Sequence, residues 1–159
     1  MVFHVPYVLI PFFVWSCAQV TKLVIDYYYG RSLHWDSLRS SGWFPSTHGT
    51  LTSSMLTVVF LTDWRNSNLF LLAAVLSFLV RYDAANVRYE SGKHAQHINS
   101  IKKEIDEVLL TEHLTLKNKL PSLLLKERIG HTPVEVIGGI LYGTTMTLLV
   151  VWLLGFVWY

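Results

Sequence analysis

The sequence predicts an all-α integral membrane protein, a helical bundle of about four transmembrane helices with a cytoplasmic amphipathic helical segment. Of its 159 residues, 52% are hydrophobic and only 15% are charged. The mean hydropathy of +0.36 is high for a soluble domain of this size. The apolar residues gather in stretches near the roughly 20 residues that a membrane-spanning helix needs.

The length suits one domain, so we treat residues 1–159 as a single membrane-embedded unit. The expected spans lie at about residues 5–24, 48–64, 69–86 and 136–158, with a cytosolic helical segment at about 93–128.

The first span ends near Tyr27–Tyr29, whose rings suit the membrane interface. Lys22 lies in its last turns, where a lysine either snorkels to the interface or belongs to a site. The second span follows Pro45 and is rich in Ser and Thr, so we expect it to pack against other helices. The third has a short apolar run, residues 69–80, so its outer end should lie in protein or at the interface.

The segment at 93–128 carries apolar residues at helical spacing between charged ones, which predicts an amphipathic helix. These residues are Ile98, Ile101, Ile105 and Val108. We expect this helix to lie against the membrane surface or to cap the bundle. A partner-binding helix is the alternative.

Four spans bring several polar residues to one membrane face. Of the 13 Lys and Arg residues, only Arg65 falls on the opposite face. By the positive-inside rule the basic face is cytoplasmic, or its organellar equivalent, and both termini point to the other side. The residues gathered on the basic face include Lys22, Arg31, Ser46, His48, Asp83, Arg88, His131 and Glu135.

His131 and Glu135 stand four apart, which places both side chains on one helix face. Pro133 suits the first turn of that helix. A carboxylate one turn away can hold an imidazole in one tautomer and make it more nucleophilic. The alternative is a helix-capping histidine with a glutamate that interacts favourably with the helix dipole, and these residues alone do not separate the two.

Two histidines from different helix starts, surrounded by positive charges, suit a phosphate better than a metal, whose ligands should be closely spaced. Helix N-termini attract anions, and Ser46 and Thr47 add hydroxyl donors before one of them. Lys22 and an arginine can neutralise charge during transfer. One histidine could attack phosphorus while the other protonates the leaving oxygen.

These motifs resemble the signatures of the type 2 phosphatidic acid phosphatases and vanadium haloperoxidases. The chain is most similar to the divergent short membrane branch of that superfamily, labelled acid phosphatase/vanadium-dependent haloperoxidase-related, along nearly its whole length. The matching segments are Ala18–Lys22, Ser41–His48, Tyr82–Arg88 and Gly130–Pro133.

The resemblance implies that His131 forms a phosphohistidine, that Glu135 orients it, and that His48 is the general acid. It also implies a phosphate-binding set without a metal or cofactor, although vanadate or free phosphate could occupy the site. This set comprises Lys22, Arg31, Ser46, Thr47, Asp83 and Arg88.

The sequence departs from the superfamily pattern in four places. Leu125 stands six residues before His131, where the superfamily has an arginine, and we favour Arg88 as its replacement over Arg128. Tyr29 stands where the first motif has another arginine, and Arg31 is the nearest substitute. Glu135 replaces an aspartate, and about four spans replace the usual six.

The resemblance therefore favours a membrane phosphatase for a lipid phosphate monoester of the phosphatidic acid, phosphatidylglycerol phosphate or polyprenyl phosphate type. The alternative is a catalytically weak or inactive lipid-phosphate-binding or scaffold protein of the same fold. A small transporter fits less well, because the polar residues gather at one end. The expected partners are the lipid substrate and the bilayer, with no nucleic acid, and a homo-oligomer is left open.

Overall fold

The computed structural model describes residues 5–30, 44–63, 67–111 and 124–155. These residues are helical apart from short connections, and no strand occurs among them, so the predicted all-α membrane bundle is confirmed. The helices are α1 (Val5–Tyr28), α3 (Thr47–Asp63), α4 (Ser67–Tyr82), the π-helical turn η1 (Asp83–Val87), α5 (Arg88–Thr111) and α6 (Pro133–Leu153).

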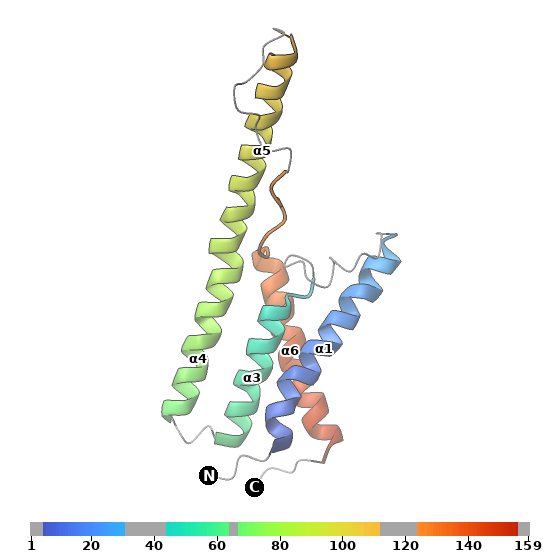
Figure 1. Ribbon diagram of the computed structural model, residues 1–159. Coiled ribbons are helices and arrows are strands. Elements are labelled where there is room, and N and C mark those ends of the chain that lie inside the picture. Colours follow the sequence, from blue (N-terminus) through green and yellow to red (C-terminus); the bar gives the residue numbers. More distant parts are fainter. Residues whose placement is uncertain (1–4, 31–43, 64–66, 112–123, 156–159) are drawn as a thin grey trace.

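Helix α3 occupies the middle of the bundle and packs against α1, α4 and α6 (Figure 1). Its small polar residues are covered by these neighbours, with Thr50, Ser53 and Ser54 all buried. The expectation that this Ser- and Thr-rich helix packs against protein is therefore confirmed.

The contact between α3 and α6 depends on small residues. A Cβ atom at Gly139 would overlap the carbonyl oxygen of Ser46, and one at Gly143 would overlap that of Thr50. Further along, a hydrogen bond of 2.6 Å joins the hydroxyls of Thr147 and Ser54. The two backbones therefore approach closely, as helices with small residues four apart do in membranes.

The bundle has an apolar end and a polar end. Ile10, Val14, Val58 and Val151 form an apolar cluster towards the end where α1 begins and α6 finishes. At the other end, α1 and α4 finish while α3 and α6 begin (Figure 1). We call this second region the polar end. It gathers the end of α1 and the starts of α3 and α6 beside the turn η1, through which α4 continues.

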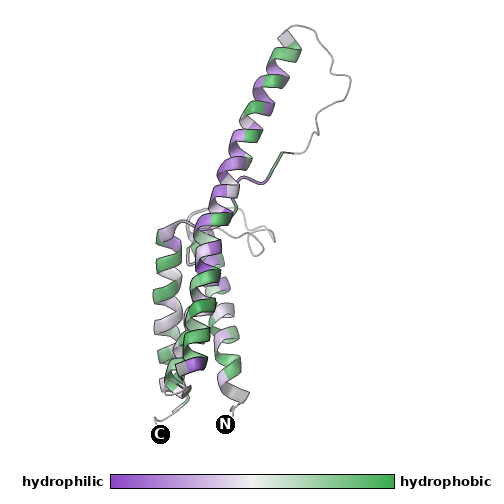
Figure 2. Ribbon diagram, turned by 90° about the vertical axis from the view of Figure 1, so that its left-hand side faces the viewer, coloured by the Kyte–Doolittle hydropathy of each residue, from purple (hydrophilic) through white to green (hydrophobic). Residues whose placement is uncertain are grey.

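Helices α4 and α5 are joined through η1 without a break, and α5 leads away from the bundle (Figures 1 and 2). Hydrophilic residues dominate α5, in contrast to α4 (Figure 2). The direction of α5 does not agree with the expectation that it lies flat or caps the bundle. The segment predicted as helical at 93–128 is helical to Thr111, whereas residues 124–128 have no regular secondary structure, which corrects that boundary. Residues 112–123 lie outside the described part.

Three helices are long and apolar enough to cross a membrane: Tyr7–Tyr28, Asn68–Thr111 and Pro133–Leu153. Helix α3 has 17 residues. At about 1.5 Å per residue it is somewhat shorter than a bilayer core of about 30 Å. The chain is an integral membrane protein, and a fourth crossing by α3 stays a prediction.

Candidate active site at the polar end of the bundle

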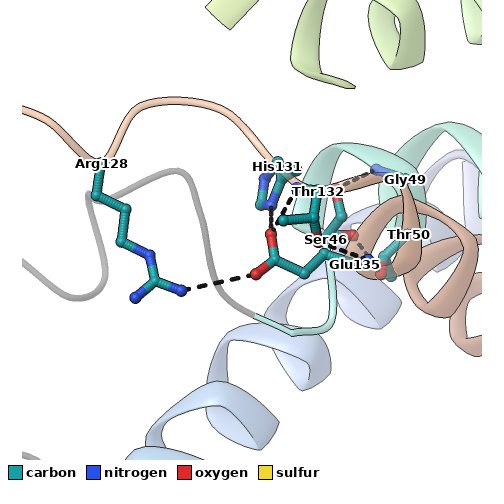
Figure 3. Close-up of polar contacts among 7 residues, drawn as sticks. All are labelled: Ser46, Gly49, Thr50, Arg128, His131, Thr132 and Glu135. Atoms are coloured by element: carbon teal, nitrogen blue, oxygen red, sulfur yellow. Dashed lines mark hydrogen bonds and ion pairs between the residues drawn. The ribbon is translucent and has the colours of Figure 1, made fainter. Parts of the chain in front are cut away.

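His131 is fully buried immediately before α6, and its Nδ1 lies 3.3 Å from Oε2 of Glu135 (Figure 3). An ionised carboxylate only accepts hydrogen bonds, so this bond requires the proton on Nδ1. The lone pair of the neutral ring is then on Nε2. The geometry thus gives His131 the tautomer that a nucleophile needs.

The start of α6 explains how Glu135 reaches His131. Thr132 is the N-cap: its Oγ1 accepts from the Glu135 N–H at 3.3 Å, and its N–H donates to Glu135 Oε2 at 3.0 Å. This is a capping box, in which each residue satisfies a backbone donor of the other. The capping residue is therefore Thr132 rather than His131, and Glu135 serves both the helix start and the imidazole.

The main chain of His131 is fixed against η1. Its N–H donates to the carbonyl oxygen of Ala84 at 2.9 Å. The preceding Gly130 has φ +84°, and a Cβ there would overlap the backbone of Tyr89 and Arg88. Only glycine fits this position without strain. The π-helical turn, a feature often found at functional sites, therefore sets the position of His131.

His48, in the first turn of α3, faces His131, and the two ring centroids are 5.7 Å apart with an angle of 68° between the planes. His48 Nδ1 and His131 Nε2 are both buried without a hydrogen-bond partner among the described residues. Buried polar atoms are normally satisfied, so a bound group that hydrogen-bonds these two nitrogens would complete the arrangement.

Positive charge surrounds the two histidines. Lys22 on α1 is only 4% exposed and lies within electrostatic range of Glu135 and Asp26. His48 lies within electrostatic range of Lys22 and Arg88. A lysine covered by neighbouring helices does not fit the snorkelling alternative, so Lys22 belongs to the same region as the histidines.

Arg88 and Asp83 form an ion pair of 2.6 Å in which both side chains are about half exposed. The Arg88 N–H also donates to the Asp83 carbonyl, the i to i+5 bond of a π-turn. Arg88, the favoured replacement arginine, is thus near His48 but engaged with Asp83. Arg31 lies outside the described residues.

Ser46 and Thr47 are both buried at the start of α3. Ser46 Oγ accepts from the Gly49 N–H at 3.2 Å, and the Ser46 N–H donates to the Glu135 carbonyl at 3.1 Å. Ser46 therefore caps α3 and joins it to α6, which holds the two histidine-bearing helix starts together. Its hydroxyl acts as an acceptor in the cap and keeps its own proton for donation.

The described part of the chain brings together two histidines, a buried lysine and a carboxylate that contacts one of the histidines. These residues belong to the motifs identified in the sequence. The profile of the Divergent PAP2 family matches residues 3–146. This chain belongs to the Divergent PAP2 family.

One relative is the uncharacterized membrane protein YuiD of Bacillus subtilis (strain 168), which is 32% identical over 133 residues. That match covers 82% of this chain and 84% of YuiD. No solved structure matches this member of the Divergent PAP2 family.

Two arginines have roles that the sequence did not reveal. Arg128 Nη2 lies 3.7 Å from Glu135 Oε1 (Figure 3). Arg81 on α4 donates to the hydroxyls of Thr52 and Ser53 at 3.1 and 2.7 Å, which joins α4 to α3. The sequence shows Arg128 three residues before His131, but the hydroxyl partners of Arg81 follow only from the packing of α4 against α3.

A cleft of about 430 Å³ opens between α5 and residues 127–130, with Arg128 and Glu135 on its wall. The carboxylate of Glu135 is thus approached from two sides, by His131 within the bundle and by Arg128 from the cleft. Within the described ranges, no three His, Cys, Asp or Glu side chains are grouped so that they could hold a metal ion. Metal independence stays a prediction.

Proposed function

We propose that this member of the Divergent PAP2 family is a membrane phosphatase that hydrolyses a lipid phosphate monoester through a phosphohistidine intermediate. The observation that carries the proposal is the pair of facing imidazoles. The ring centroids of His48 and His131 are 5.7 Å apart, one nitrogen of each ring is buried without a partner among the described residues, and Glu135 contacts Nδ1 of His131.

In the first step, His131 Nε2 attacks phosphorus and a P–N bond forms while the bond to the ester oxygen breaks. Protonated His48 gives its proton to the departing alkoxide, which leaves as the lipid alcohol. Glu135 stabilises the positive charge that develops on the His131 ring.

In the second step, water attacks phosphorus and the P–N bond breaks. His48, now neutral, takes the proton of that water, and inorganic phosphate leaves. Lys22 and Arg88 neutralise the phosphoryl oxygens in both steps, and Ser46 and Thr47 donate hydrogen bonds to them. Asp83 orients Arg88 through their 2.6 Å ion pair.

The position of the site suits a lipid substrate. It lies where α1 ends, α3 and α6 begin and α4 continues into η1, and the sides of these helices expose apolar residues such as Val24, Leu79 and Ile137. A lipid could keep its acyl or prenyl chain in the bilayer while its phosphate reaches the two histidines. Phosphatidic acid, phosphatidylglycerol phosphate and polyprenyl phosphates all share this form.

The testing experiment measures phosphate release from these three lipids by the purified protein in mixed micelles, with and without EDTA and with vanadate. We expect turnover of at least one lipid that survives EDTA, because cationic side chains supply the charge a metal supplies elsewhere, and that vanadate inhibits. His131→Ala should be inactive, whereas His97→Ala, an exposed histidine on α5, should match wild type. Binding without turnover would support the lipid-phosphate-binding alternative instead.

A further inference from the structure

The two carboxylate oxygens of Glu135 have different partners. Oε2 faces His131 Nδ1 at 3.3 Å and accepts from the Thr132 N–H at 3.0 Å. Oε1 lies 3.7 Å from Arg128 Nη2. The carboxylate is therefore held from both ends, and its plane is set by contacts outside the imidazole.

Arg128 reaches this carboxylate from the side opposite the start of α3. Figure 3 shows Arg128 on one side of Glu135, and Ser46, Gly49 and Thr50 on the other. Nε2 of His131, the atom that would attack phosphorus, is on the opposite edge of the ring from the Nδ1 that Glu135 contacts. Arg128 thus contacts the Glu135 carboxylate and not the Nε2 side of the His131 ring.

A glutamate at position 135 must be restrained more than an aspartate would be. Its side chain has one more rotatable bond than aspartate, and each additional rotamer that must be restricted costs free energy. The capping box restrains Oε2, and the Arg128 contact restrains Oε1. Together they select the one rotamer in which the carboxylate faces His131.

The backbone around Arg128 is itself anchored. Asn99 of α5 bonds both the N–H and the carbonyl of Leu125, at 3.0 and 2.9 Å, and also Glu127 Oε1 at 2.8 Å. On the other side, Gly130 packs against η1. Arg128 therefore extends from a segment that is attached at both ends.

We propose that Arg128 is a positioning residue for the His131–Glu135 pair and does not bind the phosphate. This inference rests on the proposed function. It assigns the arginine nearest to the nucleophile in sequence to the carboxylate, and so leaves the phosphate to Lys22 and Arg88.

The test compares Arg128→Met, Arg128→Lys, Glu135→Gln and the double variant Arg128→Met/Glu135→Gln, with Lys126→Met as an exposed cationic control. We expect Arg128→Met to lower kcat by about twofold to fivefold, the effect of losing a half-exposed ion pair on a rate. KM and the Kd for vanadate should change by less than about twofold, and Arg128→Lys should keep most activity. In the Glu135→Gln background, Arg128→Met should have no further effect.

A rise in KM or in the vanadate Kd without a fall in kcat would overturn the inference, since it would place Arg128 on the phosphate. An equal kcat loss in both backgrounds would overturn it too. If the wild type shows no turnover, the proposed function fails, and ¹⁵N NMR of His131 decides the inference separately. Arg128→Met should then shift or broaden the His131 Nδ1–H signal, and an unchanged signal would refute the positioning role.

Discussion

At the scale of single residues, the proposed mechanism divides its chemistry between two histidines in different surroundings. His131 is fully buried with a carboxylate at Nδ1, whereas His48 is partly exposed and has positive neighbours in Lys22 and Arg88. The first arrangement favours a nucleophile with a fixed tautomer. The proposed mechanism makes His48 the proton donor for the leaving group. The two side chains should therefore respond differently to substitution.

His48→Ala should slow hydrolysis of a lipid phosphate by about 10²–10⁴-fold, because an alkoxide leaving group needs a proton. A nitrophenyl phosphate should lose much less, since its leaving group is stable without one. The measurement is kcat for both substrates in wild type and His48→Ala. Equal losses on the two substrates would remove His48 from the general-acid role.

Glu135→Gln should keep the fold, because an amide oxygen can still accept from the Thr132 N–H in the capping box. It should nevertheless lower kcat strongly, since the charge that stabilises the His131 ring in the transition state is lost. Thermal unfolding and phosphate release, measured on the same preparation, check both parts. A large loss of stability with unchanged kcat would contradict the account.

The motifs made much of this site predictable from the sequence. Four of its residues are each close to an end of a helix: Lys22, Ser46, His48 and His131. The apolar stretches of the sequence predict where these helices end, and so predict that the four residues share one region. The pairing of Arg88 with Asp83 could not be predicted, because it depends on a π-turn that no local pattern specified.

At the scale of helices, close backbone contacts position the two histidine-bearing segments. Gly139 and Gly143 allow α6 to approach α3, and the hydrogen bond from Ser46 to the Glu135 carbonyl joins their first turns. The glycines four residues apart in an apolar stretch are a sequence signal that could have revealed this contact. This contact places α6 directly beside α3 in the bundle.

Gly143→Ala should weaken the bundle, because its Cβ would overlap the Thr50 backbone. Overpacking of this kind typically costs about 1–3 kcal/mol. Thermal unfolding in detergent measures the loss, and Leu141→Ala, at a position on the same helix that is 61% exposed, provides the control. A variant as stable as wild type would show that the contact can relax without cost.

Asn99→Leu should detach the segment that leads to His131, because three hydrogen bonds to Leu125 and Glu127 are lost. Each such bond contributes about 0.5–1.5 kcal/mol. Hydrogen exchange at the Leu125 amide should rise at least about tenfold. Ser100→Ala, an exposed neighbour, should leave the exchange unchanged. Unaltered exchange in Asn99→Leu would mean that other contacts hold the segment.

At the scale of the whole molecule, the candidate site and the apolar cluster lie towards opposite ends of the bundle. The hydropathy pattern was sufficient to predict the helical bundle and its common polar end. It was not sufficient to predict that α4, η1 and α5 form one continuous helical path. No local sequence pattern in this region shows whether the helix ends or continues. The path of residues 124–128, which have no regular secondary structure, also depends on tertiary hydrogen bonds to Asn99.

The orientation can be tested with single cysteines at Lys126 and Leu154 in a Cys17→Ser background. The positive-inside rule places Lys126 in the cytoplasm, or its organellar equivalent, and Leu154 on the other side. A membrane-impermeant maleimide should label each from one side only in oriented vesicles. Labelling of both cysteines from the same side would contradict the topology.

The central claim is that His131 becomes phosphorylated during turnover. Rapid acid-free quenching with a lipid phosphate, followed by mass spectrometry, tests it directly. The account predicts an acid-labile phosphate on His131 that reaches a steady level in wild type and is absent in His131→Ala. Turnover without a phosphohistidine, or with the phosphate on another residue, would contradict the mechanism.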